Sequence, residues 1–142
     1  MKFVYDDGGR KEAGFKGDTG DCFCRAVAIA AQLPYKEVYE RINQIAKGER
    51  LGRKKKTRSH ARTGVFKYTR KKLLQELGWE WTPTMQVGQG CKVHLRKDEL
   101  PRGRLVVSLS KHSLAVVDGV AHDTYPDDIG GTRCVYGYWK KV

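Results

Sequence analysis

The sequence contains few prolines and few cysteines, and it lacks any long apolar run. Four prolines and four cysteines are spread over 142 residues. A membrane-spanning helix needs about 20 consecutive apolar residues, and no segment approaches that length. The first residues, MKFVYDDGGRKEAGF, also lack the apolar core of a secretory signal peptide. We therefore expect a cytoplasmic protein that does not interact with a membrane.

The scarcity of cysteine argues against a metal centre. Cys22 and Cys24 form a C-x-C pair, and Cys91 lies in CKVH together with His94, while Cys134 stands alone. Neither spacing is that of a standard structural zinc site. In a cytoplasmic setting we expect the thiols to be free, and we expect the protein to hold no metal and no cofactor.

Acidic residues are scarce relative to basic ones. The chain has 28 Lys and Arg against 16 Asp and Glu, a net charge of +12, which attracts polyanions such as nucleic acid or acidic proteins. Residues 47–72 contain one acid, Glu49, and the part over about 47–63 is expected to be flexible. A solvated loop and a surface that contacts phosphates or an acidic substrate both fit this composition. The candidate contact residues are Lys54, Lys55, Lys56, Arg58, Arg62, Arg70, Lys71 and Lys72.

Length and patterning predict one α+β domain over residues 1–142. A hydrophobic fraction of 39% is sufficient for a single core. Helical patterns cover about residues 22–33, 34–48 and 64–78, and the first is apolar nearly all round, which indicates a buried helix. β-branched and aromatic segments separated by turns follow Gly78 and predict strands. We therefore predict that the helices pack on a C-terminal antiparallel sheet.

The dipeptide Asp-Gly at 118–119, between two apolar segments, predicts a two-residue hairpin with a type I′ turn. Side chains alternate between the two faces of a strand, so this register places His112 and Asp123 on one face as diagonal neighbours. His122 points to the other face. One additional residue in the turn would reverse every one of these assignments.

A thiol at the start of a helix has the properties of a nucleophile. Cys22 follows a polar turn in TGDCFCRAVAIAAQL, where the helix dipole and a neighbouring imidazolium both favour the thiolate. His112 would take the thiol proton and return it to the leaving group, and Asp123 would orient the imidazole. Asp118 is the second choice for that orienting role, and Cys24 ranks below Cys22 because it lies deeper in the helix.

The motif GDCFCRAVAIA on a buried helix, followed by KHSLAVVDGVAHDTY on strands, resembles the papain-like cysteine peptidase superfamily. It is most similar to small bacterial and phage proteins with a DC..RA helix, akin to the bacteriocin-processing peptidases. In that superfamily a Cys begins the central helix, a His begins a strand, and an Asp or Asn lies on a neighbouring strand. The resemblance covers about half of the chain, and it implies a papain-like fold, a peptide or amide substrate and those roles for Cys22, His112 and Asp123.

The segment before Cys22, GFKGDTGDC, lacks the glutamine with which papain-like enzymes complete the oxyanion hole. The Cys22 backbone N–H, Thr19 and Lys16 are the candidates to replace it. Two alternatives therefore stand beside an active thiol hydrolase. One is an inactive relative that binds nucleic acid through its basic segment, and the other is an accessory protein that binds a protein partner through the same face.

Several further residues have a simpler interpretation as structural or surface positions. Trp79, Trp81 and Trp139 are expected in the core or at its rim, where an exposed ring could instead stack on a base. His60 and His94 are expected at the surface.

Overall fold

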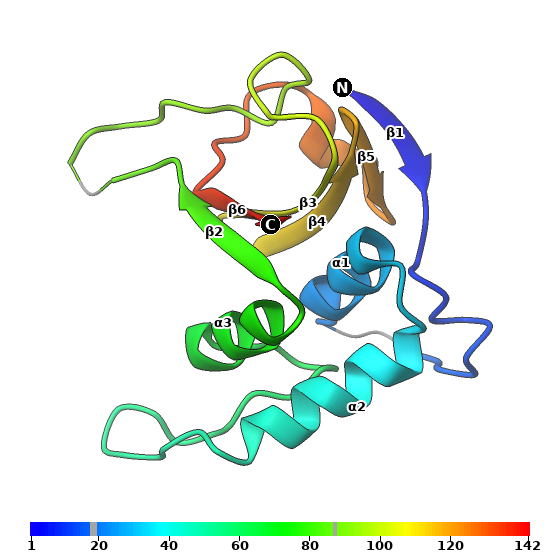
Figure 1. Cartoon of the computed structure of the whole chain (residues 1–142), viewed down its shortest axis with the longest axis vertical. Helices are drawn as coiled ribbons and strands as arrows, with labels where there is room; N and C mark the ends of the chain where they lie inside the picture. The colour runs from blue at the N-terminus through cyan, green and yellow to red at the C-terminus, as the bar shows by residue number, and fades with distance from the viewer. Residues whose placement is uncertain (18–19, 87) are drawn as a thin grey trace.

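The computed structural model describes residues 1–17, 20–86 and 88–142. The described residues form three α-helices and six strands, and Figure 1 shows their α+β arrangement, the fold class that the sequence predicts. Within the described residues, no helix is long and apolar enough to cross a membrane. In chain order the elements are β1 (Lys2–Tyr5), α1 (Cys22–Ala31), α2 (Tyr35–Ala46), α3 (Lys67–Glu76), β2 (Trp79–Pro83), β3 (Arg104–Leu109), β4 (His112–Val117), β5 (Val120–Asp123), the 3-10 turn η1 (Pro126–Ile129) and β6 (Gly137–Lys141).

All six strands belong to one sheet with the order β1-β5-β4-β3-β6-β2. Its pairings are antiparallel except at one edge, where β1 runs parallel to β5 and Phe3 lies opposite Ala121. The C-terminal strands β2 to β6 pair antiparallel as predicted, and the N-terminal segment MKFVY adds a parallel edge strand that makes the sheet mixed. Alternation of apolar residues identifies a strand but does not specify its partner or direction.

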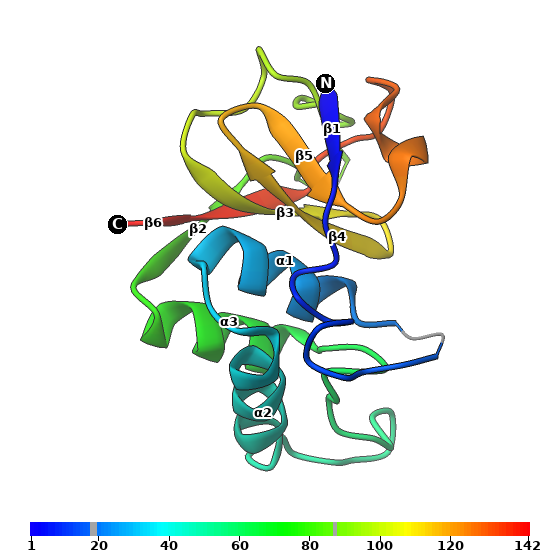
Figure 2. The ribbon, with the colours of Figure 1, turned by 90° about the vertical axis from the view of Figure 1, so that its right-hand side faces the viewer.

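The helices cover one face of the sheet, with α1 against the strands and α2 and α3 beneath it (Figure 2). Alternate strand residues divide between two buried clusters. Val106 and Ala115 pack with the helices, whereas Leu105 and Val116 pack on the opposite face with Leu95 from the β2–β3 connection. Helix α1 is therefore buried between the sheet and the other helices, which explains why its sequence is apolar nearly all round.

The predicted hairpin is present with the predicted register. Val117 pairs with Val120, and Ala115 pairs with His122. Asp118 and Gly119 have φ angles of 48° and 79°, as a type I′ turn requires. The Asp118 carboxylate also accepts a hydrogen bond from the Gly103 N–H at 2.8 Å. Its side chain therefore holds the turn against the residue before β3.

We expect Gly119→Ala to lower the free energy of unfolding by about 1–2 kcal/mol, because a Cβ at positive φ is strained. The added atom would also lie 2.5 Å from Cγ of Lys97, which must move aside. Gly130 is a matched control, since its φ is −68° and nothing lies within 4 Å of the position that a Cβ would take there. Urea denaturation of both variants measures the difference, and equal stabilities would contradict the strained-turn explanation.

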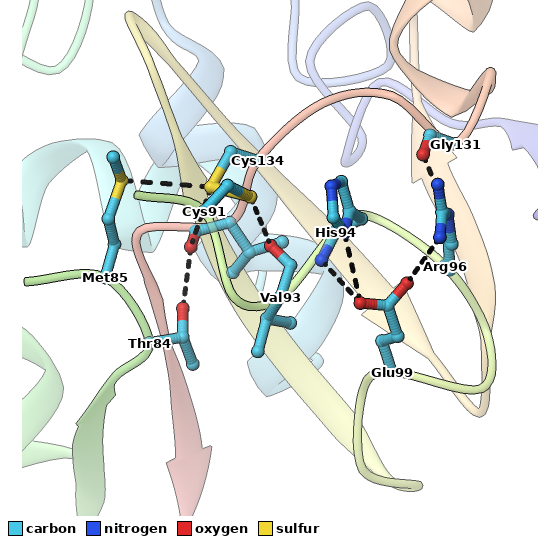
Figure 3. The surroundings of a disulfide bond; sticks show 10 residues. Thr84, Met85, Cys91, Val93, His94, Arg96, Glu99, Gly131 and Cys134 are labelled. Atoms are coloured by element: carbon cyan, nitrogen blue, oxygen red, sulfur yellow. Dashed lines mark hydrogen bonds and ion pairs between the residues drawn. A yellow bond between two sulfur atoms is a disulfide. The ribbon is translucent and has the colours of Figure 1, made fainter. Parts of the chain in front are cut away.

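Cys91 and Cys134 form a disulfide with a Cα–Cα distance of 5.8 Å, and Figure 3 shows its surroundings. The expectation of four free thiols is therefore wrong for these two residues. The bond joins the β2–β3 connection to the segment before β6, where His94 and Cys134 also form a β-bridge. The sequence places the two cysteines far apart in segments without a strong pattern, so only the folded chain shows that they are neighbours.

Glu49 connects the basic segment, about residues 47–63, to α3. Its buried carboxylate accepts hydrogen bonds from the Ser59 N–H at 2.6 Å and from the hydroxyls of Ser59 and Thr69, and Lys55 lies 2.9 Å away. Burial raises the pKa of Glu49, but these hydrogen bonds outweigh it and lower the pKa to about 2. The one acid of this segment thus organises the loop that precedes α3.

Candidate active site

Cys22 is the first residue of α1 and its side chain is partly buried. The imidazole of His112 and the backbone N–H of Ser113 both act on its thiol and lower its pKa. Because Cys22 lies in the first turn, its own N–H has no carbonyl partner within the helix. The thiol therefore meets the start of β4 at the positive end of the α1 dipole.

His112 connects this thiol to a carboxylate. Its Nε2 lies 2.6 Å from Oδ2 of Asp123, whose side chain is 3% exposed. Since Nε2 is bonded to Asp123, Nδ1 is the nitrogen that remains for the thiol. The structure thus places the three predicted side chains in the order thiol, imidazole, carboxylate.

The electrostatics of the pair favour a thiolate and an imidazolium. Burial raises the pKa of Cys22, but the hydrogen bond and charge of His112, the Ser113 N–H and the charge of Arg70 outweigh it and lower the pKa below its ordinary value. Burial lowers the pKa of His112, but the hydrogen bonds to Asp123 and Cys22 outweigh it and raise the pKa to about 9. Each group therefore stabilises the ionised form of the other.

Cys24 differs from Cys22 in every respect that matters for reactivity. It is fully buried, and its sulfur lies 4.0 Å from the Tyr35 carbonyl. Burial and the nearby charge of Asp21 raise the pKa of Cys24 to about 12. The structure therefore agrees with the sequence in ranking Cys24 below Cys22.

The hairpin brings His112 and Asp123 together, but strand alternation does not explain how they reach Cys22. Leu114 and Val116, on the same strand face as His112, pack in the cluster away from the helices. The last β4–β5 pair is Ala115 with His122, so His112 and Asp123 lie beyond the part where β4 and β5 pair with each other. Each still pairs with the strand on its other side. At that end of the sheet their side chains are within reach of α1.

A second layer of charge supports Asp123. Nη2 of Arg25 lies 3.6 Å from Oδ1 of Asp123, and Nη1 of Arg25 is hydrogen-bonded to the fully buried carboxylate of Asp21. Asp21 also accepts a 2.6 Å hydrogen bond from the Tyr35 hydroxyl, and Nε of Arg10 lies 3.4 Å away. Arg25 therefore links Asp21, the residue before Cys22, to Asp123.

Arg70 is a second cation whose charge acts on the Cys22 thiol. Its Nε donates to the Val65 carbonyl at 2.7 Å, its Nη1 lies 3.1 Å from Oγ of Ser113, and its guanidinium stacks 4.8 Å from the Phe23 ring. The backbone N–H of Ser113 also lowers the pKa of Cys22. The sequence predicts Arg70 as a surface cation, whereas the structure places it partly buried beside the candidate nucleophile.

The other predicted residues lie outside this cluster. Thr19 falls outside the described residues, and Lys16 is exposed, with its carbonyl accepting a hydrogen bond from Arg62 at 2.8 Å. His60 is exposed as expected, and His94 is partly buried with Nδ1 3.2 Å from Glu99. No group of three or more His, Cys, Asp or Glu among the described residues could hold a metal ion. The predicted cations that are exposed are Lys54, Lys56, Arg58, Lys71 and Lys72.

Sequence reasoning missed the roles of Arg25 and Arg70, although both carry a detectable signal. Arg25 is the one charged residue of α1 and stands four residues after Asp21, the spacing of a helical ion pair. Arg70 shares its helix face with Leu73, Leu74 and Leu77, so helical periodicity directs it toward the core.

No family model matches the chain, and neither a curated protein nor a solved structure matches it. Function is therefore inferred from the geometry and chemistry of the cluster around Cys22.

Proposed function

We propose that the protein is a thiol hydrolase that cleaves peptide or amide bonds through a thioacyl intermediate. Cys22 attacks the carbonyl carbon, His112 holds the thiol proton and delivers it to the leaving amine, and Asp123 orients the imidazolium. Water, activated by His112, then releases the acyl group from the sulfur. The observation that supports this most strongly is the position of His112 between the Cys22 thiol and the Asp123 carboxylate, 2.6 Å from the latter.

The same arrangement supports a papain-like relationship. A nucleophile at the start of a buried helix, a histidine at the start of β4 and an aspartate at the end of β5 match the pattern to which the sequence is similar. The Cys22 N–H is the oxyanion donor in this proposal, since it belongs to the first turn of α1. The expected cytoplasmic location stays a prediction, and the Cys91–Cys134 disulfide favours an oxidising compartment instead.

We expect a limiting amount of iodoacetamide to alkylate Cys22 alone when the disulfide is left intact. The hydrogen-bonded imidazolium stabilises the Cys22 thiolate, so alkylation should persist at pH values well below 9, the ordinary thiol pKa. It should fall about tenfold or more near pH 6.5 in His112→Ala, which lacks that imidazolium. Peptide mapping by mass spectrometry and the rate of adduct formation measure both effects.

Cys24 provides the internal control, because burial and a pKa of about 12 should keep it unreactive in the folded protein. Equal labelling of Cys22 and Cys24, or an alkylation rate unchanged in His112→Ala, would contradict the proposed thiolate–imidazolium pair.

A basic scaffold that binds nucleic acid, or a protein partner through the same face, is the second candidate. The exposed cations of the basic segment and α3, including Lys54, Lys56 and Lys72, favour it. Nucleic-acid retention that weakens steeply with salt and is unchanged in Cys22→Ala would favour this function over hydrolysis.

A further inference from the structure

A cavity of about 580 Å³ is lined by Arg70, whose charge acts on the Cys22 thiol, and it is within the size range of ligand pockets. It lies between α3 and strands β2, β3 and β6. Arg70 lines it, lies 3.1 Å from the Ser113 hydroxyl and lowers the pKa of the Cys22 thiol through its charge. The cavity is therefore one side chain away from the thiol.

Aromatic rings form one part of the cavity wall. Trp81 and Trp139 have ring centroids 5.4 Å apart, and Phe66 adds a third ring that is 45% exposed. The position of the Trp81 ring depends on Gly137, because a Cβ at that residue would lie 2.3 Å from the ring. A partly exposed aromatic wall held in place by a glycine suits an aromatic side chain of a ligand.

Cations form the other part of the wall. Lys67, Arg70 and Lys71 line the cavity, and no acidic residue of the described chain lines it or forms an ion pair with any of the three. Basic side chains gathered without acidic partners favour an anionic ligand. The lining thus combines rings for an aromatic group with positive charge for a carboxylate.

We propose that this cavity binds the substrate segment beside the scissile bond and selects an aromatic residue accompanied by an acidic residue. This inference rests on the proposed thiol hydrolase function, since Arg70 both lines the cavity and contacts Ser113, the residue after His112. The aromatic side chain packs against Trp81 and Trp139, and the neighbouring carboxylate meets Lys67, Arg70 and Lys71.

Binding can be measured in the full chain with Cys22→Ala, which prevents turnover. The probe is an acetylated pentapeptide with one phenylalanine followed by two glutamates, and the matched peptide has glutamines in their place. Two of the three tryptophans line the cavity, so fluorescence reports binding. We expect the glutamate peptide to bind about tenfold more tightly at low salt, because charge attraction is lost with glutamine.

Charge-reversal variants test whether the lysines of the cavity cause the preference for the glutamate peptide. Lys67→Glu combined with Lys71→Glu should remove the preference for the glutamate peptide. Lys11→Glu combined with Lys92→Glu is the matched control, since both lysines are exposed, neither lines the cavity, and the net charge changes equally. That pair should retain the preference, whereas equal losses in both pairs would assign the effect to overall charge and overturn the proposal.

Two further results would overturn the proposal. One is equal affinity for the glutamate and glutamine peptides, and the other is tighter, competing binding of a five-residue oligothymidylate. Failure of the hydrolase function has a different signature. Selective peptide binding without preferential alkylation of Cys22 would support the proposed ligand class and contradict the hydrolase function. A reactive Cys22 without peptide preference would support the hydrolase function and contradict the proposed ligand class.

Discussion

Replacement of His112 by alanine is expected to lower kcat/KM for peptide-ester and peptide-amide hydrolysis by about 10³-fold, within the usual range for loss of a general acid–base. His112 is the group that both stabilises the Cys22 thiolate and carries the proton to the leaving amine. The initial release of nitrophenolate from a peptide nitrophenyl ester measures acylation. Release of nitroaniline from the matching anilide also requires protonation of the leaving amine. The loss should be larger for the anilide.

His122 is the matched control because it lies on the same hairpin and its Nδ1 lies 3.6 Å from the Asp6 carboxylate. His122→Ala should retain activity within about twofold, since its imidazole faces Asp6 and has no part in the proposed proton transfer. His112→Gln provides a second variant that keeps a polar side chain beside Asp123 but cannot carry the proton. Similar activities for the His112 and His122 variants, or no nitrophenolate release by the unaltered protein, would contradict the proposed mechanism.

Replacement of Asp21 by asparagine is expected to lower the free energy of unfolding by about 3–5 kcal/mol, the usual cost of removing one partner from a buried ion pair. The carboxylate of Asp21 is fully buried, binds Arg25 and accepts a hydrogen bond from Tyr35. Asparagine keeps the shape but leaves the Arg25 guanidinium without this counter-charge. Urea denaturation at pH 7, followed by circular dichroism, measures the change.

The Lys36–Glu40 pair supplies a control of the opposite kind. Its side chains are 70% and 66% exposed and lie 3.9 Å apart. Glu40→Gln should therefore produce no measurable change in the urea midpoint, since exposed ion pairs contribute little. An Asp21→Asn variant as stable as the Glu40→Gln variant would show that the Arg25–Asp21 pair does not hold the start of α1.

The local elements of the candidate site could be predicted because each depends on residues close together in the chain. The two-residue turn at 118–119 determines the register of β4 and β5, and hence that His112 and Asp123 meet. A polar turn followed by an apolar helical pattern likewise places Cys22 at the start of a buried helix. No local pattern relates Cys22 to His112, so their pairing is a hypothesis drawn from the chemistry of a thiol and an imidazole and supported by the resemblance to papain-like enzymes.

Only the tertiary structure decided which distant groups became neighbours. In the folded chain β1 pairs with β5, and Cys91 is bonded to Cys134. Arg70, which the sequence predicts as a surface cation, is partly buried and contacts Ser113. Turn conformation and side-chain periodicity act over a few residues and leave such long-range choices open. Burial of the apolar faces of the helices and the sheet determines which distant segments pack together. A buried charge such as Arg25 then requires ion-pair partners, which Asp21 and Asp123 provide.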